Sequence, residues 1–576
     1  MAAEPLDLLI VGAGPAGLLS SIIASQLGLS HRVIEARGGL HPEPSAHVLK
    51  THAMEIYRRV GVAEAIHASA TPAQLMRYIT WCDSVAGLIY GQLDLTGMRG
   101  DVPRFNNISP THSANLPQSL LEPILHARAR QLAGGDMVNF GTAFQGFEQT
   151  PECVISTVLT QEGSRQIQSR YVIGADGARS AVRRAAGITF EGPRVLANFL
   201  AIHIKSDVRP LLTRAPGVLF FVRRQVQEGF FIMHQPVGSQ VFMLRFDPTR
   251  QPFESFDERR CAAIIEDAMG YEHRFEISSI DQWAMSAQIA TEYRRGRVLL
   301  VGDAAHRFPP TGGLGLNTGI EDVENLIWKL AAVLRGKAAA ALLDTHAVET
   351  RPIAVRNTNQ SVTNHRRMQE VDAAIGLDQT PAAFSELKQA LADNPQHERF
   401  AAIQSAVRAQ IAHFAFLELE MAAVAEAGAF IPAARPIAYP VPELEGYQPS
   451  FQPGNHIPHL WLAPGVSTLD RLAFDRFTLF APEESAAAWS SVASRLGDDV
   501  MSVNVISLPA DARSPIASAA DFWGGKPYAV LVRPDGRIGW VEPESCHDRF
   551  EQLQRAMRAI LSPGALTSRP VERILA

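Results

Sequence analysis

Three glycines near the start of the chain have the spacing of a dinucleotide-binding turn. Gly12, Gly14 and Gly17 follow the apolar segment LDLLIV and precede the apolar segment LLSSIIASQL. In this GxGxxG pattern, the first glycine allows a tight turn, the second lets the backbone approach a pyrophosphate, and the third lets the helix pack on the strand. Glu35 ends the next apolar segment, where its carboxylate can accept hydrogen bonds from a ribose. We therefore predict that this turn, including Ala16, binds the adenosine half of FAD or NAD.

A second glycine-rich turn follows the segment RVLLVG near residue 300 and also opens a helix. Asp303 ends the predicted strand, where it can accept hydrogen bonds from a polyol such as the ribityl chain of a flavin. The residues that stiffen the backbone or let it lie flat against a planar ligand are Pro309, Pro310, Gly312, Gly313 and Gly315. The helix that begins near Leu316 and Asn317 directs its N–H groups and its positive dipole end at that ligand. A reduced flavin is negative at its N1 and O2 edge, so we predict that this turn holds the reactive end of FAD.

A third turn, YVIGADGARSAVRR, lies between these two in the sequence. Asp176 follows a predicted strand and precedes a predicted helix. Taken by itself, the pattern is typical of a strand-to-helix turn in which the aspartate caps the helix. Taken with the other two turns, Asp176 is a candidate cofactor contact. Both interpretations stay open at this point.

The hydrophobic periodicity predicts the elements that position these turns. Residues 6–37 form a strand, helix, strand unit, and a further helix covers about 118–132. Segments with period two dominate between about 190 and 290, and long helical segments run from 320 to about 430. A proline-rich stretch then precedes another alternation of strands and helices. The pattern indicates an α/β protein with a β-rich insertion.

Composition excludes several classes of protein. With 576 residues the chain exceeds what one hydrophobic core usually supports, so we expect two to four domains. A net charge of −6 argues against a nucleic-acid partner. The four cysteines are far apart and form no CxxC or metal-like spacing, which favours a reducing cytoplasm. We expect neither a signal peptide nor a membrane span.

The three turns, in this order, resemble those of the group A flavoprotein monooxygenases, the single-component FAD-dependent aromatic hydroxylases. The segments PSAHVLKTHAMEI, NLPQSLLEPIL, PGNHIPHLWL and YAVLVRPDGRIGW are similar to the phenol hydroxylase branch, which includes the 2,4-dichlorophenol and 2-hydroxybiphenyl hydroxylases. The resemblance implies an α/β fold with a Rossmann-like FAD-binding domain of the para-hydroxybenzoate hydroxylase type. The resemblance also implies a β-sheet substrate domain and a C-terminal thioredoxin-like domain without CxxC.

The domain ranges that follow are discontinuous. We expect the FAD-binding domain at 1–75, 110–188 and 290–365, and the β-rich substrate domain at 76–109 and 189–289. A helical segment at 366–430, a linker at 431–454 and the thioredoxin-like domain at 455–576 complete the chain. The resemblance also implies a homodimer.

The same resemblance implies the cofactors and their contacts. FAD would bind tightly but non-covalently, NAD(P)H would bind transiently, and O2 would react to form a flavin C4a-hydroperoxide that hydroxylates a phenol. Besides the residues already named, Gln118 would contact FAD near the ribityl or phosphate region, and Pro310 would line the place where oxygen and substrate meet. The family's arginines are missing where His52 and Ser45 stand, which puts arginine contacts to FAD in that loop in doubt.

Hydroxylation of a phenol is helped by a base that removes the phenolic proton. His47 is our candidate, because it lies on the loop that the family brings over the flavin and its imidazole titrates in the useful range. A histidine that is merely hydrogen-bonded within the loop is the competing interpretation. For the substrate pocket, GFFIMHQPV offers either the alternating set with Met233 or the set with His234, and the pattern does not choose between them.

Two other functions remain compatible with the motifs. The same fold could carry out a Baeyer–Villiger oxygenation or an epoxidation of a polycyclic or polyketide-like substrate. A non-catalytic flavin-binding protein is the second alternative. The apolar stretch around residue 232 lacks the arginine with which benzoate-binding relatives hold a carboxylate, and this favours an apolar phenol as the substrate.

Overall fold

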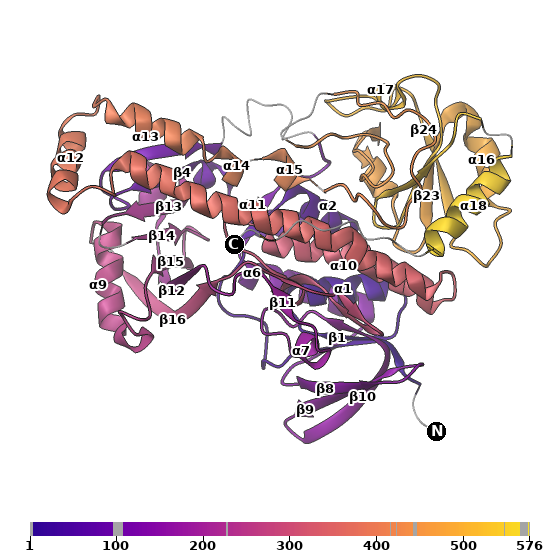
Figure 1. The fold of residues 1–576 in the computed structure, drawn as a ribbon, viewed down its shortest axis with the longest axis horizontal. Coiled ribbons are helices and arrows are strands. Elements are labelled where there is room, and N and C mark those ends of the chain that lie inside the picture. Colours follow the sequence, from indigo (N-terminus) through magenta and orange to yellow (C-terminus); the bar gives the residue numbers. More distant parts are fainter. Residues whose placement is uncertain are drawn as a thin grey trace.

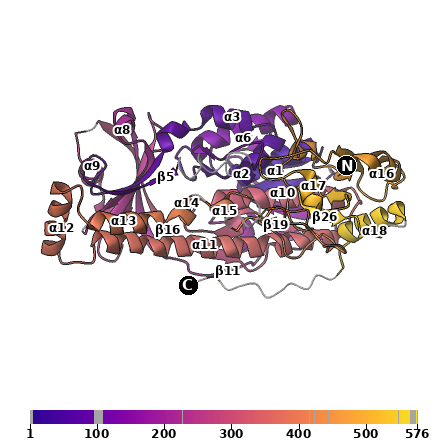
Figure 2. The ribbon, with the colours of Figure 1, turned by 90° about the horizontal axis from the view of Figure 1, so that it is seen from above.

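The computed structural model describes residues 4–95, 108–225, 228–272, 274–414, 416–421, 423–441, 446–545, 548–564 and 574. Its three largest sheets have eight, seven and four strands. Figure 1 shows the seven-stranded sheet at one end of an elongated molecule, the eight-stranded sheet near the middle and the four-stranded sheet at the other end. The long helix α11 (Thr345–Ile375) runs along the molecule between the two ends (Figures 1 and 2).

The eight-stranded sheet carries all three predicted turns at one edge. Its order is β18-β19-β10-β1-β2-β7, and β8 and β9 extend it from β10. The strands β1 (Leu6–Val11), β10 (Gly163–Gly174) and β19 (Val298–Leu300) are parallel neighbours. Val11 pairs with Gly174, and Gly174 pairs with Leu300, so the three strands end side by side. Ligands of open parallel sheets bind at this carboxyl edge, and here each strand end leads into one of the three turns.

The strands of this sheet are apolar because both of its faces are covered. One face packs against α1 (Pro15–Gln26), α6 (Gln118–Ala133) and α10 (Gly315–Leu334), and the other face packs around α7 (Ala181–Ala185). Parallel strands buried in this way have continuous apolar sequences, as in LLIV of β1. The remaining elements of this part include β2 (His31–Ile34), β3 (Val48–Leu49), α2 (Thr51–Arg59), α3 (Ala63–Ser69), β6 (Ala114–Asn115), β7 (Val138–Asn139), β8 (Ala143–Gln149), β9 (Val154–Thr160), β18 (Arg294–Arg295) and β20 (His306–Arg307).

The seven-stranded sheet combines two segments that are distant in the sequence. Its order is β16-β12-β15-β14-β13-β4-β5. The strands are β4 (Tyr78–Cys82), β5 (Ile89–Asp94), β12 (Ala197–Ser206), β13 (Gly217–Arg223), β14 (Glu228–Ile232), β15 (Gln240–Arg245) and β16 (Phe275–Met285). One face packs on α9 (Glu258–Met269), and part of the other packs on α11 and α13 (Arg399–Arg408). Because successive strand residues alternate between faces, this arrangement decides which residues can meet a substrate.

The C-terminal sheet has the order β24-β23-β25-β26. β23 (Phe477–Pro482) is parallel to β24 (Val503–Leu508) and antiparallel to β25 (Val530–Val532), which pairs with β26 (Ile538–Val541). The helices α16 (Ala486–Ala493) and α18 (Arg549–Leu561) contribute to one core, and α17 (Ala519–Trp523) contributes to another. This is the arrangement of a thioredoxin-like domain. Cys82, Cys153 and Cys261 are free thiols, and Cys546 lies outside the described residues.

No helix within the described residues is long and apolar enough to cross a membrane. The domain ranges expected from the sequence remain a prediction, and 442–445 of the expected linker also lie outside the description. The other helices of the region after α11 are α12 (Pro381–Asp393), α14 (Ile411–Phe414) and α15 (Leu417–Glu420).

A buried ionic network joins the C-terminal domain to the helices α10 and α11. Arg533, just after β25, donates from both terminal nitrogens to the Glu349 carboxylate of α11 at 2.7 Å. Lys329 of α10 donates to the same carboxylate at 2.8 Å. All three side chains are fully buried. Burial opposes the charge on Glu349, but Arg533 and Lys329 outweigh it and hold the pKa of Glu349 well below its usual range.

We expect Arg533→Met to lower the free energy of unfolding by about 3–5 kcal/mol, because it leaves a buried carboxylate without its main partner. Urea unfolding followed by tryptophan fluorescence would measure this. Arg476→Met is the matched control, since Arg476 pairs with Asp475 at the surface, where an ion pair contributes about 0–1 kcal/mol. Equal unfolding midpoints for the two variants would contradict the prediction.

Candidate active site

The first glycine turn has no room for side chains at two of its three glycines. Gly12 has φ +106°, and a Cβ there would lie 2.3 Å from the carbonyl oxygen of Ala175. A Cβ on Gly17 would lie 1.9 Å from the carbonyl oxygen of Gly12. A Cβ on Gly14 would meet only Glu122 Oε1, at 4.0 Å. The turn therefore packs tightly on the sheet at Gly12 and Gly17. At Gly14 it leaves space next to the backbone, which the close approach of a pyrophosphate requires.

Helix α1 begins at this opening with free N–H groups. Its N-cap is Gly14, which has no side chain to accept a hydrogen bond, and the first turn contains no acidic residue. Unpaired N–H groups and the positive end of the helix dipole favour an anion at such a terminus. Gln118 of α6 lies nearby, because its Nε2 donates at 2.7 Å to Glu122 Oε1, the oxygen that faces Gly14. The geometry of the turn fits the phosphates of FAD.

Glu35 holds the turn from the neighbouring strand β2. Its Oε2 accepts from the backbone N–H of Ala13 at 2.9 Å, and its Oε1 accepts from both the backbone N–H and Nε of Arg37 at 3.0 Å. Burial opposes ionisation, but these hydrogen bonds outweigh it and lower the pKa of Glu35. The ionised carboxylate keeps unused acceptor positions, so it can also serve a ribose.

Asp176 has a clear structural role. Its carboxylate accepts from Ser180 Oγ at 2.6 Å and from the backbone N–H groups of Ala181 and Val182 at 2.6 and 3.0 Å, at the start of α7. Asp176 therefore makes the helix-capping contacts that one of the two interpretations of the sequence predicts. A contact from Asp176 to the cofactor remains a proposal.

The second glycine turn touches the first one. A Cβ on Gly302 would lie 3.4 Å from Ala16 Cβ in α1, and one on Gly319 in α10 would lie 3.0 Å from Gly302 Cα. The starts of α1 and α10 thus meet at the residue before Asp303. The Asp303 side chain remains exposed, yet the surrounding protein raises the pKa of its carboxyl by desolvation, against the nearby charge of Arg307 and His306.

The start of α10 is also open for a ligand. Its N-cap, Leu314, makes no side-chain cap, and the first turn contains no acidic residue. Gly315 and Leu316 are half-buried, whereas Pro310 is exposed and its carbonyl accepts from the N–H of Gly313. Asn317 is buried. These first-turn N–H groups can therefore face the flavin edge, as the sequence predicts.

The Asn317 side chain ties the His47 loop to this helix. Its Oδ1 accepts from the N–H of Lys50 at 2.8 Å, and its Nδ2 donates to the carbonyls of Val48 and Gly313 at 2.9 and 2.7 Å. Glu420 holds the same loop from the other side by accepting from Lys50 Nζ at 3.1 Å. The loop is thus fixed over the start of α10.

The structure brings the two predicted histidines together. The rings of His47 and His234 lie edge to face with centroids 4.9 Å apart. His47 Nδ1 donates to Asn115 Oδ1, which leaves Nε2 as the free basic nitrogen. Burial lowers the pKa of His47 more than the Asn115 hydrogen bond raises it. Burial, with His47 and His203 nearby, holds the pKa of His234 well below its usual range. Both rings are therefore neutral at pH 7.

The sheet register separates the two alternative sets of pocket residues. Ile232 pairs with Val241, which pairs with His203, so these side chains share the face that leads to His234. Met233 is buried in the core that includes α9, on the opposite face. The proposed substrate contacts therefore include His234 and not Met233. Asn115 and His203 were not predicted, since only the pairing of distant strands and loops brings Asn115 to His47 and His203 to His234.

Comparison with known proteins agrees with this geometry. Residues 5–361 match the family model "FAD binding domain", and residues 450–564 match "Aromatic-ring hydroxylase, C-terminal". The chain is 30% identical to 2,4-dichlorophenol 6-monooxygenase of Cupriavidus pinatubonensis over 96% of both chains. It is 31% identical to phenol 2-monooxygenase of a Pseudomonas species, over 99% of this chain and 94% of the relative. The crystal structure of the flavin-dependent monooxygenase PieE with FAD and substrate superposes with a TM-score of 0.88, at 28% identity over 97% of this chain and 100% of that one.

The chain therefore belongs to the family of proteins built on this FAD binding domain. Within it, the chain is a single-component FAD-dependent aromatic hydroxylase, which uses NAD(P)H and O2. The non-catalytic alternative is set aside by this finding.

Proposed function

We propose that the protein hydroxylates an apolar phenol, and that His47 accepts the phenolic proton. The observation that carries this proposal is the placement of His47. Its loop is fixed by Asn317 over the flavin end of α10, and its ring faces His234 at the end of the substrate sheet. A base at this junction is within reach of both a flavin and a ring bound on the sheet.

We assign FAD to the three turns as follows. The adenosine and pyrophosphate would be held by Glu35 and the α1 terminus, and the ribityl chain by Asp303. The start of α10 would meet the pyrimidine edge of the flavin. The remaining proposed contacts are Gly12, Gly14, Ala16, Gly17, Gln118, Asp176, Gly315, Leu316 and Asn317, with Pro310 beside the reacting ring. The close approach of Gly302 to Ala16 supports the proposal that one extended ligand lies along both turns.

Bound FAD, when reduced by NAD(P)H, supplies the electrophilic oxygen by reaction with O2. The chain's own part is to position the ring and to remove its proton. With Nδ1 bonded to Asn115, His47 Nε2 is the atom that takes the proton, and the lowered pKa keeps it free to do so at neutral pH. The deprotonated phenol is the more electron-rich ring.

The sheet face beside His234 favours a neutral ligand. The row that crosses it consists of His203, Val241, Ile232 and Leu219. This row offers apolar surface and neutral imidazole, and a benzoate carboxylate would find no cationic partner in it. A phenol satisfies both features, since its ring is apolar and its hydroxyl can bond an imidazole.

A panel of phenols and matched benzoates tests the proposal. We expect the phenols to accelerate NAD(P)H oxidation and to gain one oxygen atom by mass spectrometry, and the benzoates to do neither. If no phenol accelerates NAD(P)H oxidation, the assignment is wrong. If ring ketones gain an oxygen atom instead, a Baeyer–Villiger reaction takes its place. The homodimer and the cytoplasmic location also remain proposals, which light scattering and cell fractionation would test.

A further inference from the structure

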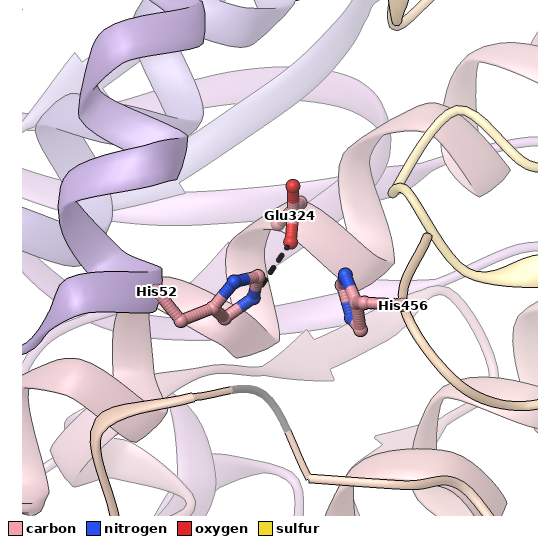
Figure 3. Close-up of side chains that lie close together, drawn as sticks. All are labelled: His52, Glu324 and His456. Atoms are coloured by element: carbon pink, nitrogen blue, oxygen red, sulfur yellow. Dashed lines mark ion pairs between the residues drawn. The ribbon is translucent and has the colours of Figure 1, made fainter. Parts of the chain in front are cut away.

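Three side chains from distant parts of the chain meet between α10 and the C-terminal domain. They are His52 of α2, Glu324 of α10 and His456, which precedes the C-terminal sheet. One nitrogen from each histidine and one carboxylate oxygen lie within 4.8 Å of one another. Figure 3 shows the three groups pointing toward a common space. The motifs used for FAD and substrate do not include any of them.

His52 turns its Nε2 toward this space, 3.5 Å from Glu324 Oε2. Its Nδ1 donates to Glu55 Oε2 at 2.9 Å. Burial opposes a charge on His52, but Glu324 and Glu55 outweigh it and raise its pKa to about 10, so a metal ion would displace a proton from Nε2. Nε2 is buried and makes no hydrogen bond. A histidine that binds a metal through one nitrogen and donates the other N–H to a carboxylate has this arrangement. Glu55 therefore orients His52 as a ligand.

The spacing between His52 and Glu324 suits a shared cation. The two groups are 3.5 Å apart, from Nε2 to Oε2. An N–H···O hydrogen bond spans about 2.7–3.2 Å. Two ligands of a tetrahedral zinc ion with bonds of 2.0–2.2 Å lie roughly 3.3–3.6 Å apart. The other oxygen of Glu324 is paired with Arg59, so the carboxylate is already turned with Oε2 toward His52.

The surroundings of the three groups contain charges of both signs. They line a cavity of about 10 Å³, together with Glu321, Asp322, Asp535 and Arg537. Arg537 donates to the carbonyls of Ala423 and Gly454, at 2.7 and 2.9 Å, so its charge is directed to those oxygens. The space is about the size of one water molecule or a single small ion.

We propose that His52, Glu324 and His456 bind a divalent cation, Zn2+, and that this structural site fastens the C-terminal domain to α2 and α10. Two imidazoles and a carboxylate are a ligand set that zinc accepts, and a water would take the fourth position. The ion would add a bond between three elements that already meet through the ion pair of Arg59 with Glu324. The site is independent of the proposed phenol chemistry, because within the described residues none of its three ligands forms a hydrogen bond or ion pair with His47 or with the predicted flavin turns.

The test uses the full-length protein with FAD bound. After treatment with a chelator and dialysis, Zn2+ is titrated in, bound zinc is counted by elemental analysis, and its ligands are read by X-ray absorption. We expect one zinc per chain, a shell of nitrogen and oxygen without sulfur, and a higher thermal midpoint with zinc than without. A folded, yellow protein that takes up no zinc would overturn the proposal, and His52 would then be a buried imidazolium between Glu55 and Glu324.

Two variants and a matched control separate this site from adventitious zinc. His456→Gln should weaken zinc binding by at least about 100-fold, and Glu55→Gln, which removes the carboxylate that accepts from His52, by about 10–100-fold. His459→Gln is the control, because His459 lies three residues on and bonds Ser467 Oγ instead. Zinc bound equally well by Glu55→Gln and His459→Gln would also overturn the proposal, even if His456→Gln failed to fold.

Discussion

His47→Ala should lower the rate of phenol hydroxylation by about 10²- to 10⁴-fold at pH 7, which is the usual contribution of a general base. The cause would be loss of the Nε2 acceptor, since Nδ1 is already bonded to Asn115. Product formation per NAD(P)H consumed, measured with a saturating phenol, gives the effect on coupling. FAD should still bind, because the contacts that hold its turns do not involve the His47 side chain.

The pH dependence distinguishes a base from a packing residue. Because the pKa of His47 is lowered from 6.5, the wild-type rate should stay constant through neutral pH and fall only below that value. In the variant the deficit should shrink as the pH approaches about 10, where a phenol ionises by itself. His397→Ala serves as the control, because His397 lies in the turn between α12 and α13 and is not part of the proposed site. A His47→Ala variant with normal coupling at pH 7 would rule out the assignment.

Gly17→Val should give a protein without bound FAD. The added side chain would begin 1.9 Å from the carbonyl oxygen of Gly12; Gly12 lies in the turn after β1, and Gly17 lies in the first turns of α1. Neither can move without opening the turn, so we expect loss of the yellow colour and of much soluble protein. The visible spectrum of the purified chain measures the effect.

Gly14→Ala separates the ligand from the fold. A Cβ at Gly14 meets only Glu122 Oε1, at 4.0 Å, so the apoprotein should fold and bind FAD more weakly, because the methyl group enters the space of the pyrophosphate. Gly38→Ala is the control, since a Cβ there meets nothing within 4 Å. Full FAD occupancy in Gly14→Ala would contradict the placement of the pyrophosphate.

The residue pattern predicted the local elements well. The predicted helix at about 118–132 corresponds to α6 (Gln118–Ala133), and the predicted unit at 6–37 corresponds to β1, α1 and β2. These elements depend on the order of apolar and polar residues over a few turns, which is visible in the chain itself. The glycine turns were visible for the same reason, because their geometry is set within six residues.

The choice between Met233 and His234 shows where such reasoning stops. Alternation along β14 gives two faces, but only the packing of α9 on one of them decides which face is core. Asn115 and His203 were missed for a related reason. Asn115 reaches His47 although the two are 68 residues apart, and the pairing of β12 with β15 places His203 near His234.

The sequence by itself determined the family, the cofactor and the three turns, because each of these depends on residues that are close together in the chain. Tertiary structure alone decided that Gly302 touches Ala16, that His47 faces His234, and that His52 meets Glu324 and His456. Contacts of this kind depend on the register of strands and the docking of domains. Those are set by the burial of whole faces, which no short pattern of residues records.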